Sequence, residues 1–93
     1  MSRLEGPPER IDYLARRFEE VVVPLLRGLD GFQGAMVLAD RDRGTSIAIS
    51  FWESEQALRA SEAAVSRPRE EAEAAAQASS PSIVENFEVV VRV

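Results

Sequence analysis

The sequence contains no cysteine and no histidine, and each absence excludes a class of chemistry. Without cysteine, the chain can form no disulfide and offers no thiolate nucleophile or zinc–thiolate site. Without histidine, it lacks the side chain that most often binds metals and transfers protons near neutral pH. Carboxylates remain as metal ligands, but the sequence has no DxDxDG calcium loop. We therefore expect a protein that holds no metal and no other cofactor.

Lysine is also missing, so all 11 basic residues are arginine, and the net charge is -5. Phosphate backbones attract clusters of basic residues, so we do not expect a nucleic-acid partner. Long apolar runs are scarce: the longest, "VVVPLL" at 21–26, is far shorter than the ~18–20 residues of a membrane span. The first ten residues, "MSRLEGPPER", contain no apolar signal-peptide core. We expect a cytoplasmic protein without a membrane partner.

The remaining composition is that of a soluble globular protein, with 45% hydrophobic and 29% charged residues. The 93 residues predict a single domain over 1–93. A domain of this size buries roughly 60–65% of the surface that its unfolded chain exposes. Its core is therefore thin, and a partner chain would add stability.

Hydrophobic periodicity predicts the elements of the first half of the chain. Residues 1–5 can form a very short strand. Apolar residues recur at helical spacing over 8–27, and Pro24, which has no N–H, is expected to kink this helix or end it early. The stretches "FQGAMVLAD" at 32–40 and "TSIAISFW" at 45–52 are typical of strands. The four residues between them predict a β-hairpin.

The second half begins with Ser54, a typical helix N-cap, and a helical pattern continues to about residue 66. Pro68 ends this helix or begins another, and the alanine-rich stretch after it favours helix through residue 78. "SSPS" then breaks the chain at 79–82, and the β-branched stretch at 83–93 predicts a long final strand. The order is β-α-β-β-α-(α)-β. It predicts a ferredoxin-like α+β fold, in which helices cover one side of an antiparallel sheet.

The short loop also predicts the register of the hairpin, because side chains alternate between the two faces of a sheet. In this register Leu38 pairs with Ile47, and we expect such large side chains to lie under the helices. The opposite face carries small uncharged residues and one tryptophan: Gln33, Ala35, Val37, Ala39, Ser46, Ala48, Ser50 and Trp52. Such a face leaves a cavity or receives the sheet of a partner chain.

Three stretches carry a resemblance to a known family: "EGPPERID" opening the first helix, "GFQG" opening the second strand and "FWESEQAL" after the third. They resemble the antibiotic biosynthesis monooxygenase-like domains of the dimeric α+β barrel superfamily. The resemblance implies a homodimer that pairs two sheets. It also implies a ligand pocket between each sheet and its helices or partner. The activities that it suggests are cofactor-independent oxygenation and, in some members, haem degradation.

The haem-degrading members differ from this sequence at the residues that matter for haem. They ligate iron with a histidine late in the second helical region, and they use a tryptophan in that region and an asparagine on the first strand. This sequence has no histidine, has Ser61 where that tryptophan would lie, and begins its first strand with "SRL". We therefore do not expect haem chemistry.

Four residues are candidates for contact with a small hydrophobic or aromatic ligand: Trp52, Ser50, Gln33 and Arg92. Trp52 could instead be a packing anchor. Tyr13 lies off the apolar stripe of its helix, so it is more simply a surface residue than a proton donor.

Two functions remain open. The first is cofactor-independent oxygenation of an electron-rich aromatic or polyketide-like substrate, which needs a dry pocket and donors for a substrate anion. The second is a non-catalytic ligand-binding or scaffold domain, which the lack of an obvious base favours.

Overall fold

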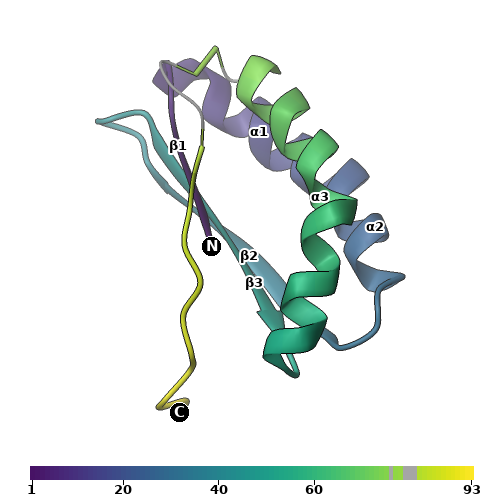
Figure 1. Cartoon of the computed structure of the whole chain (residues 1–93). Coiled ribbons are helices and arrows are strands. Elements are labelled where there is room, and N and C mark those ends of the chain that lie inside the picture. Colours follow the sequence, from purple (N-terminus) through teal and green to yellow (C-terminus); the bar gives the residue numbers. More distant parts are fainter. Residues whose placement is uncertain (76, 79–81) are drawn as a thin grey trace.

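The computed structural model describes residues 1–75, 77–78 and 82–93, and within these residues four strands form one antiparallel sheet. The strands are β1 (Ser2–Glu5), β2 (Phe32–Asp40), β3 (Thr45–Trp52) and β4 (Ile83–Val84). Their spatial order is β2-β3-β1-β4, and the helices cover one side of the sheet (Figure 1). This is the ferredoxin-like α+β arrangement that the sequence predicted.

The first helical region spans the predicted residues but changes its geometry along the way. A 3₁₀ turn, η1 (Pro8–Arg10), leads into α1 (Ile11–Arg17), a π-helical turn, η2 (Phe18–Val22), and finally α2 (Val23–Arg27). Pro24 has no N–H, so the carbonyl of Glu20 has no α-helical donor, and wider turns commonly form at such points. The helical region does not end early at Pro24 but continues to Arg27, and its departure from regular α-helix is the π turn just before the proline.

The bounds and register of the β2–β3 hairpin are as predicted, but the two faces of the sheet are reversed. Leu38 pairs with Ile47, and Leu38 is 47% exposed on the side away from the helices. Val37 and Ala48, which form a neighbouring pair, line a cavity beneath the helices. The helices themselves carry large inward side chains, so the small residues of the sheet make room for them. The expectation that Leu38 and Ile47 lie under the helices was wrong.

A bulge at the start of β2 places Phe32 beside Trp52. Phe32 pairs with Trp52 and Gly34 with Phe51, so Gln33 is an extra residue in this strand. The Phe32 and Trp52 rings meet edge to face, with centroids 5.4 Å apart and planes at 63°. Gly34 has a φ of 143°, a conformation that is open to glycine and strained for other residues.

The third helix, α3 (Glu55–Ala75), is continuous through Pro68, so the predicted stop or restart at this residue was wrong. Its flanks are rich in good helix formers, which offset the missing N–H of the proline. The predicted N-cap is confirmed, since the Ala57 N–H donates to Ser54 Oγ at 3.1 Å. Although α3 has 21 residues, neither it nor any other helix in the described residues is long and apolar enough to cross a membrane.

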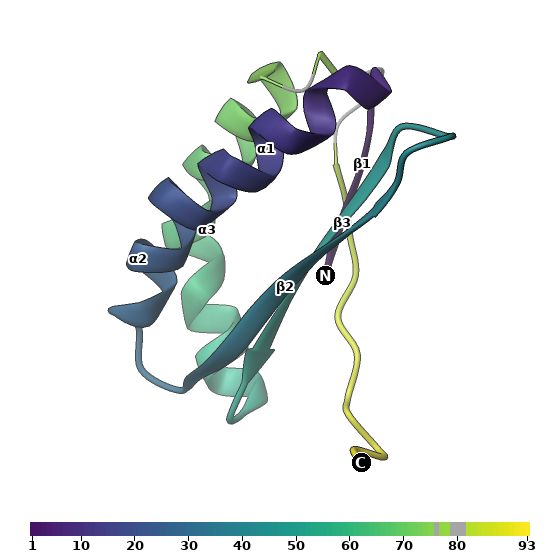
Figure 2. The same cartoon turned by 180° about the vertical axis from the view of Figure 1, so that it is seen from behind.

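The end of the chain is less regular than predicted. Only the two residues of β4 are assigned to a strand, and a backbone hydrogen bond from Glu85 N–H to the Met1 carbonyl extends their pairing with β1. The segment from 86 to 93 then continues beyond the N-terminal end of β1 without further assigned strand structure (Figures 1 and 2). Most of the predicted break at 79–82 lies outside the described residues.

Candidate ligand-binding site

A cavity of about 150 Å³ lies between the sheet and the helices that cover it. Its sheet side is formed mainly by small or apolar residues, among them Leu4, Val37, Ser46, Ala48, Ser50 and Trp52. Its helix side carries larger apolar residues, among them Leu14, Phe18, Val22, Leu26, Leu58 and Val65. The cavity exists because alternate positions of β3 are Ser46, Ala48 and Ser50, which project little above the sheet.

Trp52 forms part of the cavity wall at the end of β3. Its indole Nε1–H donates a hydrogen bond to Ser50 Oγ at 2.9 Å, and its ring packs against Phe32. Trp52 therefore both packs and lines the cavity, so the two roles considered for it are not exclusive. The bulge at Gln33 makes this arrangement compatible with the register, because it keeps Phe32 on the same face as Trp52.

A second hydroxyl reaches the cavity from the helical layer. Ser61 lines the cavity from α3 and is 4% exposed, and its Oγ–H donates to the Leu58 carbonyl at 2.6 Å. Ser61 was not among the residues predicted from the sequence to contact a ligand. Leu58, Ser61, Val65 and Ala72 all line the cavity. Their helical spacing marks the inward stripe of α3, and this was the signal that could have identified Ser61.

The charged side chains on the cavity wall are balanced in sign. The described residues that line the cavity include two arginines, Arg17 and Arg69, and two glutamates, Glu62 and Glu71. The Arg17 guanidinium lies 3.7 Å from the Glu71 carboxylate, and the Glu62 carboxylate accepts a hydrogen bond from Asn86 Nδ2 at 3.4 Å. The side chains of the wall therefore show no excess of one charge, and the ammonium of Met1, which donates to the Glu85 carbonyl at 2.9 Å, adds one positive charge.

The C-terminal segment is fastened beside the cavity by Glu73 on α3. The Glu73 carboxylate accepts hydrogen bonds from Ser82 Oγ–H at 2.6 Å and from the Ser82 backbone N–H at 3.0 Å. These bonds favour the ionised carboxylate, so they hold the pKa of Glu73 below its ordinary value. Ser82 and Val84 line the cavity just after this contact.

The structure brings two of the four candidate residues, Ser50 and Trp52, to the cavity. Gln33 is exposed at the bulge and is not part of the cavity wall. Arg92 also lies outside it: its guanidinium carbon is 5.3 Å from the ring centroid of Phe51, which alternates with Trp52 and so belongs to the opposite face.

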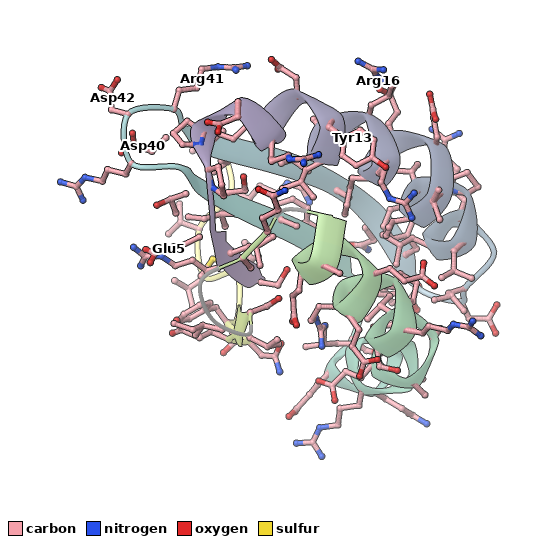
Figure 3. The ribbon with its side chains drawn as sticks, turned by 90° about the horizontal axis from the view of Figure 1, so that it is seen from above. Glu5, Tyr13, Arg16, Asp40, Arg41 and Asp42 are labelled. Carbon is pink, nitrogen blue, oxygen red and sulfur yellow. The ribbon has the colours of Figure 1, made fainter. Side chains whose placement is uncertain are left out.

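Polar residues on α1 and the hairpin loop form a separate surface feature. Figure 3 shows Asp40, Arg41 and Asp42 at the hairpin tip and Tyr13 on α1. Tyr13 is 41% exposed and does not line the cavity, which agrees with its expected surface position. Arg41 donates to both oxygens of Asp12, at 2.8 and 3.2 Å, and these bonds lower the pKa of the Asp12 carboxyl. The pair tethers the hairpin to α1.

The fold defines a ferredoxin-like α+β protein with a cavity between its sheet and its helices. The family model for antibiotic biosynthesis monooxygenase matches residues 1–78, so the chain belongs to this family. Two Mycobacterium tuberculosis (strain H37Rv) proteins, uncharacterized proteins Rv2558 and Rv2557, are each 38% identical to it over 60 residues. The match covers 64% of this chain and 25% and 27% of those proteins. The chain thus corresponds to about a quarter of the relatives' length.

Proposed function

We propose that this protein binds a small, uncharged aromatic molecule in the cavity between the sheet and the helices. The observation that carries the proposal is the cavity itself: about 150 Å³, with a mostly apolar wall that includes the indole of Trp52. An apolar cavity of about 150 Å³ in another protein accommodates benzene. This size favours a single-ring ligand over a polycyclic, polyketide-like one.

A series of ligands of increasing size tests this proposal. Trp52 is the only tryptophan, so its fluorescence reports on the cavity wall directly. We expect saturable quenching or a wavelength shift with toluene, a weaker response with naphthalene and none with anthracene. A response that grows with ring number would contradict the proposed single-ring ligand, and no response to any of the three would contradict binding in this cavity.

A second candidate function is cofactor-independent oxygenation of the bound aromatic molecule. Membership of the antibiotic biosynthesis monooxygenase family favours it. The alternative is a protein that binds its ligand without changing it, as expected if neither the serines of the cavity wall nor its two carboxylates, Glu62 and Glu71, act as the base. Oxygen consumption that follows the order of binding affinities would support the enzyme, and binding without oxygen consumption would support the non-catalytic alternative.

We also propose that the protein is a homodimer in which a second copy covers the outer face of the sheet. This face exposes large apolar side chains, including Met36 at 46% and Leu38 at 47%. Among the described residues only two hydrophobic residues, Ile11 at 4% exposure and Leu26 at 2%, are buried, so the chain alone has a small core. Proteins of the family are commonly dimeric. Two sheets that face each other in this way would complete a dimeric α+β barrel.

A further inference from the structure

We propose that Ser50 and Ser61 recognise two different polar groups of the ligand, Ser50 as a hydrogen-bond donor and Ser61 as an acceptor. The inference rests on the proposed binding of a small aromatic molecule in this cavity. The two serine roles narrow the class of ligand to an uncharged molecule with a single ring that carries both a hydrogen-bond acceptor and a hydrogen-bond donor. A phenolic aldehyde or ketone is such a molecule.

The role of Ser50 follows from the chemistry of its partner. An indole N–H can donate a hydrogen bond but cannot accept one, so Ser50 Oγ must be the acceptor in its 2.9 Å contact with Trp52. The hydroxyl proton of Ser50 is then not engaged by Trp52, and it makes no hydrogen bond to another described residue. Since Ser50 lines the cavity, this proton is free to bond to a ligand oxygen.

The role of Ser61 is the reverse. A backbone carbonyl can accept a hydrogen bond but cannot donate one, so the 2.6 Å contact with Leu58 uses the hydroxyl proton of Ser61. Its oxygen keeps lone-pair capacity at a position that is 4% exposed and lines the cavity. A ligand O–H that reaches Ser61 therefore meets an acceptor.

The two serines belong to opposite walls, because Ser50 is on β3 and Ser61 is on α3. A ligand between them meets a donor from the sheet and an acceptor from the helix, which orients it across the cavity. Trp52 acts here as a positioning residue, because its N–H occupies one lone pair of the Ser50 oxygen and so orients the Ser50 hydroxyl proton. An anionic ligand is disfavoured, since it would lose its hydration in a mostly apolar cavity whose charged side chains are balanced in sign and whose Met1 ammonium is bonded to the Glu85 carbonyl.

Calorimetric titration in mildly acidic buffer, in which the phenol of the last probe stays un-ionised, tests the assignment with three probes: toluene, anisole, which only accepts hydrogen bonds, and 4-hydroxybenzaldehyde, which donates and accepts at separate groups. For Ser50→Ala we expect anisole and 4-hydroxybenzaldehyde to bind about 3–10-fold more weakly, the effect of one neutral hydrogen bond, while toluene is unchanged. For Ser61→Ala we expect only 4-hydroxybenzaldehyde to weaken. Trp52→Phe should reduce the preference for anisole over toluene without abolishing toluene binding.

Two control variants separate these roles from general effects of the substitutions. Ser66 makes the same type of hydrogen bond as Ser61, to the Ala63 carbonyl at 3.2 Å, but it is exposed and lies outside the cavity wall, so Ser66→Ala should change no affinity. Ser46 is a second β3 hydroxyl on the wall, so Ser46→Ala tests whether Ser46, and not Ser50, donates to the ligand.

The outcomes distinguish this inference from the proposed function. Equal loss for all three probes in Ser50→Ala and Ser61→Ala, or loss of the anisole preference in Ser46→Ala instead of Ser50→Ala, would overturn the serine assignment while toluene binding stands. Absence of toluene binding to the unmodified protein would overturn both proposals. Retained toluene affinity in each variant also shows that the variant is folded.

Discussion

Trp52 illustrates how one residue can serve both the packing and the site. It packs edge to face against Phe32, lines the cavity and donates its N–H to Ser50. We expect Trp52→Ala to lower the free energy of unfolding by about 2–3 kcal/mol, less than the ~3–5 kcal/mol of a fully buried aromatic residue, because Trp52 is half-buried. Trp52→Phe should cost much less, since it keeps an aromatic ring beside Phe32. Urea unfolding, monitored by circular dichroism, measures the free energy of unfolding of both variants. Equal losses of stability in the two variants would contradict this packing role.

Glu73 should make the stability of the protein depend on pH. Its pKa is lowered in the folded state by hydrogen bonds from Ser82. A carboxyl with a lowered folded-state pKa stabilises the fold above its unfolded pKa, and this contribution is lost as the pH falls through the folded pKa. Between about pH 5 and pH 3 the unmodified protein should therefore lose more stability than Glu73→Gln. Melting temperatures across this range test it. Parallel curves for the two proteins would contradict the contact.

The site residues that could be predicted from the sequence are those on strands whose side chains alternate regularly between the two faces of the sheet. Ser50 and Trp52 were placed on one face of β3 because they are two positions apart, and the structure agrees. Gln33 was assigned to the same face by the same rule, but the bulge interrupts the alternation at that residue. Helical spacing could have placed Ser61 on the inward stripe of α3, but that a cavity lies beside this stripe depends on how α3 packs over the sheet, which is a tertiary effect.

At the level of elements, local signals were sufficient for the hairpin and insufficient for the end of the chain. The bounds of β2 and β3 follow from their alternation and the loop between them. Which face is buried depends on the large side chains of the helices, and the hairpin sequence does not contain that information. Strand pairing after Val84 depends on a neighbouring strand, so the β-branched composition of 83–93 could not determine its length.

Two changes, Gly34→Ala and deletion of Gln33, test whether the bulge in β2 is the reason that Gly34 must be a glycine. Gly34 has a φ of 143°, and an added Cβ would meet no atom within 4 Å, so any cost of Gly34→Ala comes from backbone strain. We expect this substitution to destabilise the protein by about 1–3 kcal/mol. Deletion of Gln33 should make the ladder regular with Phe32 still opposite Trp52, and in that background Gly34→Ala should cost little. Urea unfolding of the four proteins measures the coupling. Equal costs in both backgrounds would show that the bulge is not the cause.

At the scale of the whole molecule, the exposed apolar face of the sheet predicts self-association. We expect light scattering to give twice the 10.3 kDa chain mass and Leu38→Glu to give a monomer, because the charge would be buried in the interface. Leu25→Glu is a matched control, since Leu25 is 38% exposed but lies on α2 in the helical layer. A monomeric unmodified protein, or a dimer that Leu38→Glu does not disrupt, would contradict this interface.

The central claim is that the cavity between the sheet and the helices binds a small aromatic molecule, and the indole N–H resonance of Trp52 tests it most directly. The chain has one tryptophan, so its ¹H–¹⁵N spectrum should contain one such signal. We predict a saturable shift of this signal on titration with toluene, loss of the shift in Ala48→Leu, which fills the cavity, and no loss in Ala39→Leu, an exposed position on the neighbouring strand. A signal that does not move in the unmodified protein, or that moves equally in Ala48→Leu, would contradict the claim.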